Sequence, residues 1–108
     1  MNEKEISLAL RSRKISAPEA VDMRTQLAGL YAFYSEQLEE ILMRKPATWS
    51  EMRKFQKSDT ATDRIWEATQ DGLNEIGLEM RLKRIEKMLS SLKTIIDTAN
   101  TGWNHENQ

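Results

Sequence analysis

Six carboxylates recur at every fourth position in the second half of the chain and form its most regular polar pattern. They are Asp59, Asp63, Glu67, Asp71, Glu75 and Glu79. On a helix this spacing places like charges on successive turns, which costs about 0.2–0.5 kcal/mol per pair. The stripe is therefore either a solvated face or an acidic surface that meets a basic one on another helix, subunit or partner. The second interpretation makes the six carboxylates candidate partner-binding residues.

The residue types that support metal or covalent chemistry are scarce. The chain has no Cys and one His, His105, and helical Asp and Glu alone rarely form a selective transition-metal site. No G-x-S-x-G motif or phosphate-binding glycine loop occurs in the sequence. We predict a protein that is not an enzyme, with no metal and no cofactor.

Basic groups stand on both sides of the acidic stripe. Residues 59–79 carry a net charge of -5, whereas residues 44–58 and 80–93 each carry +4. Two copies of the long helix laid antiparallel would set acid against base, so the pattern predicts a homodimer. The alternative use of these cations is direct contact with the phosphates of DNA or RNA. The candidate nucleic-acid-binding residues are Arg53, Lys54, Lys57, Lys83, Arg84 and Lys87.

Trp103 is a separate candidate, because it follows Gly102 in a polar tail where nothing local can bury it. It either folds back onto the helices or anchors a partner, and the second use makes it a candidate partner-binding residue. Trp66, Tyr31, Phe33 and Tyr34 are interpreted as core residues.

Composition limits the class of protein. The 108 residues suffice for one domain, and 39% hydrophobic with 31% charged residues is too apolar for disorder and too charged for a membrane span. The absence of Cys excludes a disulfide scaffold. No apolar run long enough for membrane insertion or export occurs, so we expect a cytoplasmic protein with no membrane partner.

The elements that position these residues are helices. Residues 2–14 are expected to form a short helix or arm capped by Asn2. Ser16 and Glu19 have the spacing of a capping box, and an apolar stripe follows over 17–44 until Lys45-Pro46 ends it. A second capping pattern, Thr48 to Glu51, begins a short helical segment over 49–57.

A second long helix is expected over 60–99, and its apolar seam changes face near Gly77. The first seam is Trp66, Thr69, Leu73, Ile76 and Met80. The second seam is Leu78, Leu82, Ile85, Leu89, Leu92, Ile96 and Ala99. At about 100° per residue the seams lie well over 90° apart, so either the helix bends near Gly77 or its two halves pack against different neighbours. We expect the second seam to join two subunits.

These elements predict an all-α fold: a long-helix hairpin or small helical bundle, with coiled-coil-like pairing, completed by dimerisation. The whole chain, 1–108, is expected to be one domain, with an N-terminal helix or arm at 1–15, a helical core at 17–99 and a flexible tail at 100–108. Whether 48–99 forms one helix or two stays open.

Two stretches of the C-terminal half, DRIWEAT at 63–69 and LKRIEKMLSSLK at 82–93 with Gly72 between them, resemble small all-helical proteins of bacteriophages and prophages. The resemblance covers about 30 residues and carries no catalytic residues. It implies a non-enzymatic accessory protein that binds and modulates a protein partner. The partner would be a host or phage nucleic-acid enzyme, or a bacterial defence system such as CRISPR-Cas, in which case the protein is an inhibitor.

Overall fold

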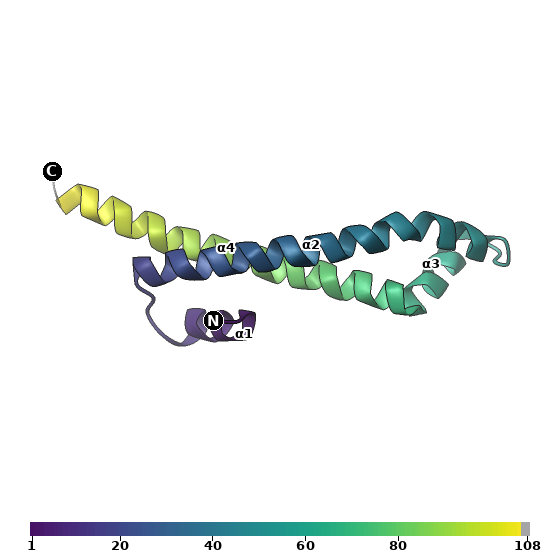
Figure 1. The fold of residues 1–108 in the computed structure, drawn as a ribbon, viewed down its shortest axis with the longest axis horizontal. Helices are drawn as coiled ribbons and strands as arrows, with labels where there is room; N and C mark the ends of the chain where they lie inside the picture. Colours follow the sequence, from purple (N-terminus) through teal and green to yellow (C-terminus); the bar gives the residue numbers. More distant parts are fainter. Residues whose placement is uncertain (107–108) are drawn as a thin grey trace. The chain divides into compact units, whose positions relative to one another are not determined.

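The computed structural model of the chain is all-α, as the sequence predicts (Figure 1). It describes the backbone of residues 1–106 and the side chains of residues 1–100. The helices in this part are α1 (Glu3–Ser12), α2 (Ala17–Arg53), α3 (Asp59–Ala68) and α4 (Gln70–Glu106). Contacts divide the chain into two compact units: unit 1 comprises Met1–Ala32 with Lys83–Gln108, and unit 2 comprises Phe33–Leu82.

The helix starts in unit 1 follow the predicted capping boxes. The Asn2 side chain accepts a hydrogen bond from the Glu5 amide at 2.8 Å, and Glu5 reaches back to the Asn2 amide. At the start of α2, the Glu19 amide donates to Ser16 Oγ at 3.3 Å. The Glu19 carboxylate in turn accepts from the Ser16 hydroxyl and pairs with Arg13 at 2.8 Å. Both caps satisfy amides that a helix start otherwise leaves unpaired.

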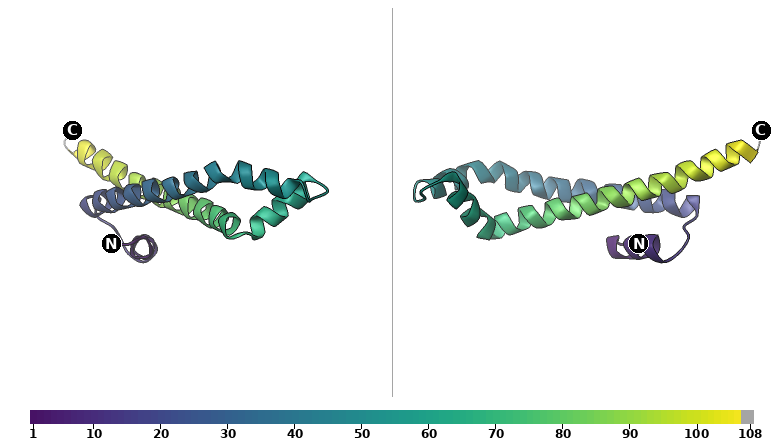
Figure 2. Two further views of the ribbon diagram at one scale, coloured as in Figure 1. Left: turned by 45° about the vertical axis from the view of Figure 1, so that its right-hand side comes forward. Right: turned by 180° about the vertical axis from the view of Figure 1, so that it is seen from behind.

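The core of unit 1 joins α1 to the first part of α2 and the second part of α4. The left view of Figure 2 looks along α1 while showing α2 along its length, so these two helices cross. The buried apolar residues are Ile6, Ala9, Ile15, Ala20, Met23, Leu27, Ile85 and Leu92. Ile85 and Leu92 belong to the predicted second seam and are fully buried within the chain, at 0% exposure. The expectation that this seam joins two subunits was therefore wrong.

In unit 2, α2 continues through Pro46 to Arg53, so the predicted helix end at Lys45-Pro46 was wrong. Pro46 has no amide to offer the Leu42 carbonyl, and an interior proline costs about 3 kcal/mol. The helix persists because Lys45 and Trp49, on either side of Pro46, are both bonded to residues of the following helices. The capping pattern from Thr48 to Glu51 consequently lies inside α2.

The predicted long helix over 60–99 is two helices with a corner between them. Ser58 caps α3 by accepting from the Ala61 amide at 3.1 Å. Thr69 ends α3 and begins α4, because its hydroxyl accepts from the Gly72 amide at 3.0 Å. The backbone of α4 then continues to Glu106, past the expected end near residue 99.

The core of unit 2 is small and contains Ile41, Thr62, Trp66, Glu75 and Leu82. Trp66 is 2% exposed, which confirms its predicted place in the core. Tyr34 is half-buried beneath the Arg81 guanidinium, 4.3 Å from the ring centroid. The core prediction was wrong for Phe33, which is 53% exposed.

The corner between α3 and α4 requires glycine at position 72. A Cβ on Gly72 would lie 1.9 Å from the Trp66 carbonyl oxygen, and its three nearest atoms all belong to the backbone of Trp66 and Glu67. Gly29, in the interior of α2, is the matched contrast, since an added Cβ there meets nothing within 4 Å. The two glycines therefore differ in steric demand while both lie in helices.

We expect Gly72→Ala to lower the free energy of unfolding by roughly 1–3 kcal/mol or more, because the methyl group forces the α3–α4 corner apart. Gly29→Ala should instead raise it by roughly 0.5–1 kcal/mol, since alanine reduces the entropy of the unfolded chain. Urea denaturation followed by circular dichroism measures both. A Gly72→Ala protein as stable as Gly29→Ala would contradict the tight corner.

Stability should also depend on pH through the start of α2. Hydrogen bonds from Arg13 and Ser16 lower the pKa of the Glu19 carboxyl below its usual value. A carboxyl with a depressed pKa in the folded protein contributes stability above its unfolded pKa, and this is lost as pH falls through the folded value. We expect NMR titration to place the Glu19 pKa below the ordinary value of a glutamate carboxyl. Arg13→Gln should move the Glu19 pKa back towards its ordinary value. An unchanged pKa would mean that the Arg13–Glu19 ion pair does not lower it.

Candidate interaction surface

The predicted acidic stripe is divided between two helices by the corner at Thr69. Asp59, Asp63 and Glu67 lie on α3, whereas Asp71, Glu75 and Glu79 lie on α4. All six carboxylates belong to unit 2, as does the basic end of α2. Because α3 and α4 return alongside α2 in this unit, four of the six carboxylates reach α2 side chains.

The two contacts of α3 lie near the α2–α3 turn. Arg53 Nε donates to Asp59 Oδ1 at 2.8 Å, and Trp49 Nε1 donates to Asp63 Oδ1 at 2.8 Å. The Asp59 side chain is 76% exposed, so its ion pair contributes at most about 1 kcal/mol. The bond to Asp63 fixes the orientation of the Trp49 indole.

The first contact of α4 is a forked ion pair. Arg44 Nε lies 3.3 Å from Asp71 Oδ2, and Arg44 Nη2 lies 3.1 Å from Asp71 Oδ1. The hydrogen bond to Asp71 raises the pKa of Arg44. Two parallel bonds restrict the orientation of both side chains and so define the register of α2 against α4 in this unit.

Lys45 and Glu75 form the most buried ion pair of unit 2. Lys45 Nζ lies 3.0 and 3.2 Å from the two carboxylate oxygens, and the Glu75 side chain is 10% exposed. The same ammonium lies 5.5 Å from the centroid of the buried Trp66 ring. A charge in such a place needs a partner, because an unpaired buried charge costs several kcal/mol.

The basic surface that meets the stripe is therefore on the same chain. Asp59, Asp71 and Glu75 are paired with cations of α2 within unit 2, whereas Asp63 accepts a hydrogen bond from the neutral Trp49 indole. Glu67 and Glu79 are exposed and form no ion pair within the part of the chain that the structure describes.

The candidate nucleic-acid-binding residues fall into different units. In unit 2, Arg53 is bonded to Asp59 and to the Gln56 carbonyl, Lys54 pairs with Glu51 at 2.8 Å, and Lys57 is exposed. In unit 1, Arg84 Nη2 lies 3.6 Å from Glu3 Oε1, while Lys83 and Lys87 are exposed one helical turn apart. Each group thus retains at least one exposed lysine.

Phe55, at the turn between α2 and α3, was not singled out as a site by the sequence analysis. Its side chain is 82% exposed, the highest value among the large hydrophobic residues whose side chains are described. Arg53 stabilises the turn by donating to the Gln56 carbonyl at 2.7 Å and to Asp59, and Ser58 caps the next helix. A signal was present in the sequence, since Phe55 stands between Lys54 and Lys57 in a segment with no apolar stripe.

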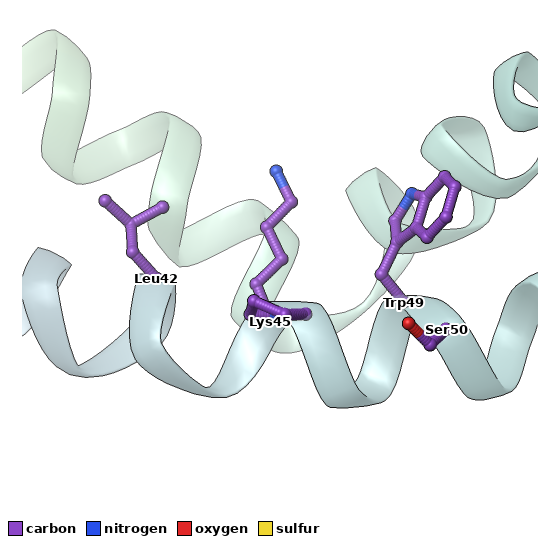
Figure 3. A pocket seen from close by; sticks show the side chains of 5 residues that line it. Leu42, Lys45, Trp49 and Ser50 are labelled. Carbon is purple, nitrogen blue, oxygen red and sulfur yellow. The ribbon is translucent and has the colours of Figure 1, made fainter.

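A shallow hollow of about 350 Å³ lies on α2 around Pro46 (Figure 3). Its lining is Leu42, Lys45, Pro46, Trp49 and Ser50. In the close-up, Leu42, Lys45 and Trp49 point to the same side of the helix. The Lys45 and Trp49 polar atoms are bonded to Glu75 and Asp63, so the hollow presents mainly apolar surface.

Three further features complete the description of the site. Trp103 and His105 lie outside the residues whose side chains are described. Among the described residues, no group of three or more His, Cys, Asp and Glu is arranged to hold a metal ion. None of the helices in that part of the chain combines the length and apolar character needed to cross a membrane.

The ion pairs predict opposite effects for two glutamates of the stripe. Glu75→Gln removes the partner of the half-buried Lys45 ammonium and should lower the free energy of unfolding by about 1–3 kcal/mol. Glu67→Gln removes an exposed carboxylate one turn from Asp63 and should leave stability unchanged or raise it by about 0.2–0.5 kcal/mol. Thermal and urea denaturation of the two proteins measure this difference. Equal stabilities would mean that the Lys45 pair does not hold α4 to α2.

Comparisons with protein-family models, with curated proteins and with solved structures find no match to this chain. Its function is therefore inferred from its own residues and contacts.

Proposed function

We propose that the chain is a non-enzymatic accessory protein of a phage or mobile element that binds and modulates a protein partner. The partner class is a host or phage enzyme of nucleic-acid metabolism or a bacterial defence system such as CRISPR-Cas, and the setting is the cytoplasm of a bacterial host. The resemblance of residues 63–69 and 82–93 to phage proteins supports the origin. The exposed apolar side chains of unit 2 support the binding role.

The single observation that carries the proposal is the exposure of Phe55 on an ordered turn. Burying a phenylalanine is worth about 1.5–3 kcal/mol, so folding that leaves it in water forgoes a large stabilisation. Two bonds from Arg53 hold the turn in place, so little conformational entropy is lost when a partner covers it. Ordered, exposed aromatic residues are typical anchors of protein interfaces.

The other exposed apolar residues are distributed unevenly between the units. Of the eleven large hydrophobic side chains exposed in the described part of the chain, eight belong to unit 2. They are Phe33, Leu42, Met43, Phe55, Ile65, Leu73, Ile76 and Met80. Because the acidic stripe is bonded internally, we place the partner contact on these apolar positions, with Glu67 and Glu79 as the remaining acidic contacts.

Self-association into a homodimer is part of the proposal. Unit 2 buries few apolar residues and leaves more of them exposed, and a second copy is one means of covering them.

Direct binding of DNA or RNA is the alternative function, and one observation favours it. Lys83 and Lys87 are exposed on successive turns of α4, and no ion pair engages them within the described residues. Phosphate contacts by such lysines would weaken steeply as salt rises.

We expect Phe55→Ala to lose partner binding without losing stability. Truncation of an anchoring aromatic residue typically costs 2 kcal/mol or more, which corresponds to about 30-fold in affinity. Affinity capture from a bacterial lysate, quantified by mass spectrometry, identifies a partner, and titration with that purified partner measures the loss. Leu8→Ala is the matched control, because Leu8 is 57% exposed but lies on α1 in unit 1.

Equal affinities of the Phe55→Ala and Leu8→Ala proteins for the partner would contradict the role of Phe55.

Titration with single- and double-stranded DNA and with RNA across a salt series tests the alternative function, direct nucleic-acid binding. Tight, salt-sensitive binding that is lost in a Lys83→Gln, Lys87→Gln protein would replace the proposed function with nucleic-acid binding.

A further inference from the structure

The hollow around Pro46 contains a backbone acceptor that the helix does not use. In an α-helix each carbonyl points towards the amide four residues on, so the Leu42 carbonyl points at Pro46, which has no N–H. Both residues line the hollow, so this carbonyl belongs to its wall (Figure 3). Ser50, one turn beyond Pro46, adds a hydroxyl. An occupant that donates hydrogen bonds can use both groups, whereas a purely apolar occupant would leave them unpaired.

An aromatic side chain with a fixed orientation forms another part of the wall. Trp49 lines the hollow, and its Nε1–H donates to Asp63 Oδ1 at 2.8 Å, which restricts rotation of the indole. The Trp49 side chain is half-buried, so part of the ring stays open to the hollow. The face of an indole attracts cations, and the planar guanidinium of arginine stacks on it. The aromatic wall therefore suits a cation that also donates hydrogen bonds.

The charges around the hollow are negative once the internal ion pairs are taken into account. Lys45 lines the hollow, but its ammonium is paired with Glu75 at 3.0 Å. Asp63 accepts from a neutral indole, so its charge is not cancelled by that bond. Glu39, one turn before the hollow on α2, and Glu67, one turn after Asp63 on α3, are exposed and form no ion pair within the described residues.

The other cations of this unit do not reverse that sign. Arg44 and Arg53, the remaining cations of α2 in unit 2, are each paired with a carboxylate. Arg64, on α3, lies about 160° around the helix from the buried Trp66 and so points away from α2. Unit 2 as a whole carries ten acidic and seven basic side chains, a net charge of -3. The charge of the unit thus favours a cationic occupant of the hollow.

We infer that the hollow binds an arginine side chain of the protein partner. Its methylene groups pack against Leu42 and Pro46, and its guanidinium stacks on the Trp49 indole. Its N–H groups donate to the Leu42 carbonyl, and the Asp63 carboxylate balances its charge. Arginine fits better than lysine, because its guanidinium is planar, weakly hydrated and carries five donors.

This inference deepens the proposed function by giving the chemistry of the partner, and it rests on that function only for the existence of a partner. The site itself can be tested on the full chain with a small probe, the methylamide of acetyl-arginine. The methylamide of acetyl-citrulline is the matched control ligand, since it has nearly the same shape but no charge. Single side chains in such hollows are expected to bind with a Kd of about 1–30 mM.

NMR titration of isotope-labelled protein reports on the site directly, because the Trp49 indole N–H gives a signal of its own. We expect this signal to shift and to saturate as the arginine compound is added. The citrulline compound should bind roughly 3-fold more weakly or worse, because it lacks the cation. An unmoved Trp49 signal, or equal binding of the two compounds, would overturn the inference.

Pro46→Ala separates binding from folding. Alanine supplies the amide that the Leu42 carbonyl lacks and removes a proline from the helix interior, so the midpoint of urea unfolding should rise. The same change occupies the acceptor, so the arginine compound should bind roughly 3-fold more weakly or worse. Because the variant is more stable, unfolding cannot account for its loss of binding. Binding as tight as that of the wild type would overturn the inference.

Two carboxylate variants test the role of charge. Asp63→Asn removes the charge but keeps a side-chain oxygen that can accept from Trp49. Glu36→Gln is the matched control, because it changes the net charge equally at an exposed position of α2 about 15 Å along the helix from Pro46. We expect roughly 3-fold weaker binding of the arginine compound by Asp63→Asn and unchanged binding by Glu36→Gln. Equal affinities of these two proteins would count decisively against the inference.

The outcomes for this site and for the proposed function are distinguishable. Phe55→Ala should bind the arginine compound as the wild type does, because Phe55 does not line the hollow. A purified partner that binds the chain while the arginine compound does not would overturn the inference and leave the proposed function standing. Binding of the arginine compound without any protein partner would support the site and contradict the proposed function.

Discussion

The fold of unit 2 depends on the pairing of the basic end of α2 with carboxylates on the two helices that follow it. The Lys45–Glu75 pair is central, because it is the least exposed and lies over Trp66. Removing Lys45 would leave the Glu75 carboxylate, which is 10% exposed, with little access to water in place of its partner. The pair also explains why α2 tolerates Pro46, since the bonds of Lys45 and Trp49 hold the helix on both sides of the missing backbone hydrogen bond.

This pairing joins the basic segment 44–58 to the acidic segment 59–79 within one chain. Residues 44–58 and 59–79 carry opposite charge. Their ion pairs span 6 residues for Arg53–Asp59, 27 for Arg44–Asp71 and 30 for Lys45–Glu75, and the entropy cost of closing a loop grows only slowly with its length. The same carboxylates repel one another along their own helices, by a few tenths of a kcal/mol per pair. Arg44 and Lys45 offset that repulsion for Asp71 and Glu75, whereas Glu67 and Glu79 have no such compensation among the described residues.

Local signals in the sequence predict the fold well where the structure is decided locally. The caps at Asn2 and Ser16, the helical class and the burial of Trp66 all follow from residue types and spacing. Local patterns misjudge three other features, and two of these, the continuation of α2 through Pro46 and the pairing of the acidic stripe, depend on contacts distant in sequence. In the sequence, Pro46 predicts a helix end that the structure does not have, and nothing around Gly72 predicts the corner between α3 and α4. The acidic stripe has the same spacing whether its partner is in the same chain or another.

Whether a residue is already bonded within the chain also determines which surfaces remain for binding. A charged residue that is satisfied inside the chain offers a partner little, because exchanging one ion pair for another gains almost nothing after desolvation. An apolar side chain in water has no such competing partner, so its burial still yields free energy when a second molecule arrives. In unit 2 the unsatisfied surface is therefore apolar, at Phe55 and along Leu73, Ile76 and Met80. Charge sets the internal register of this protein, and the exposed apolar residues determine where it can associate.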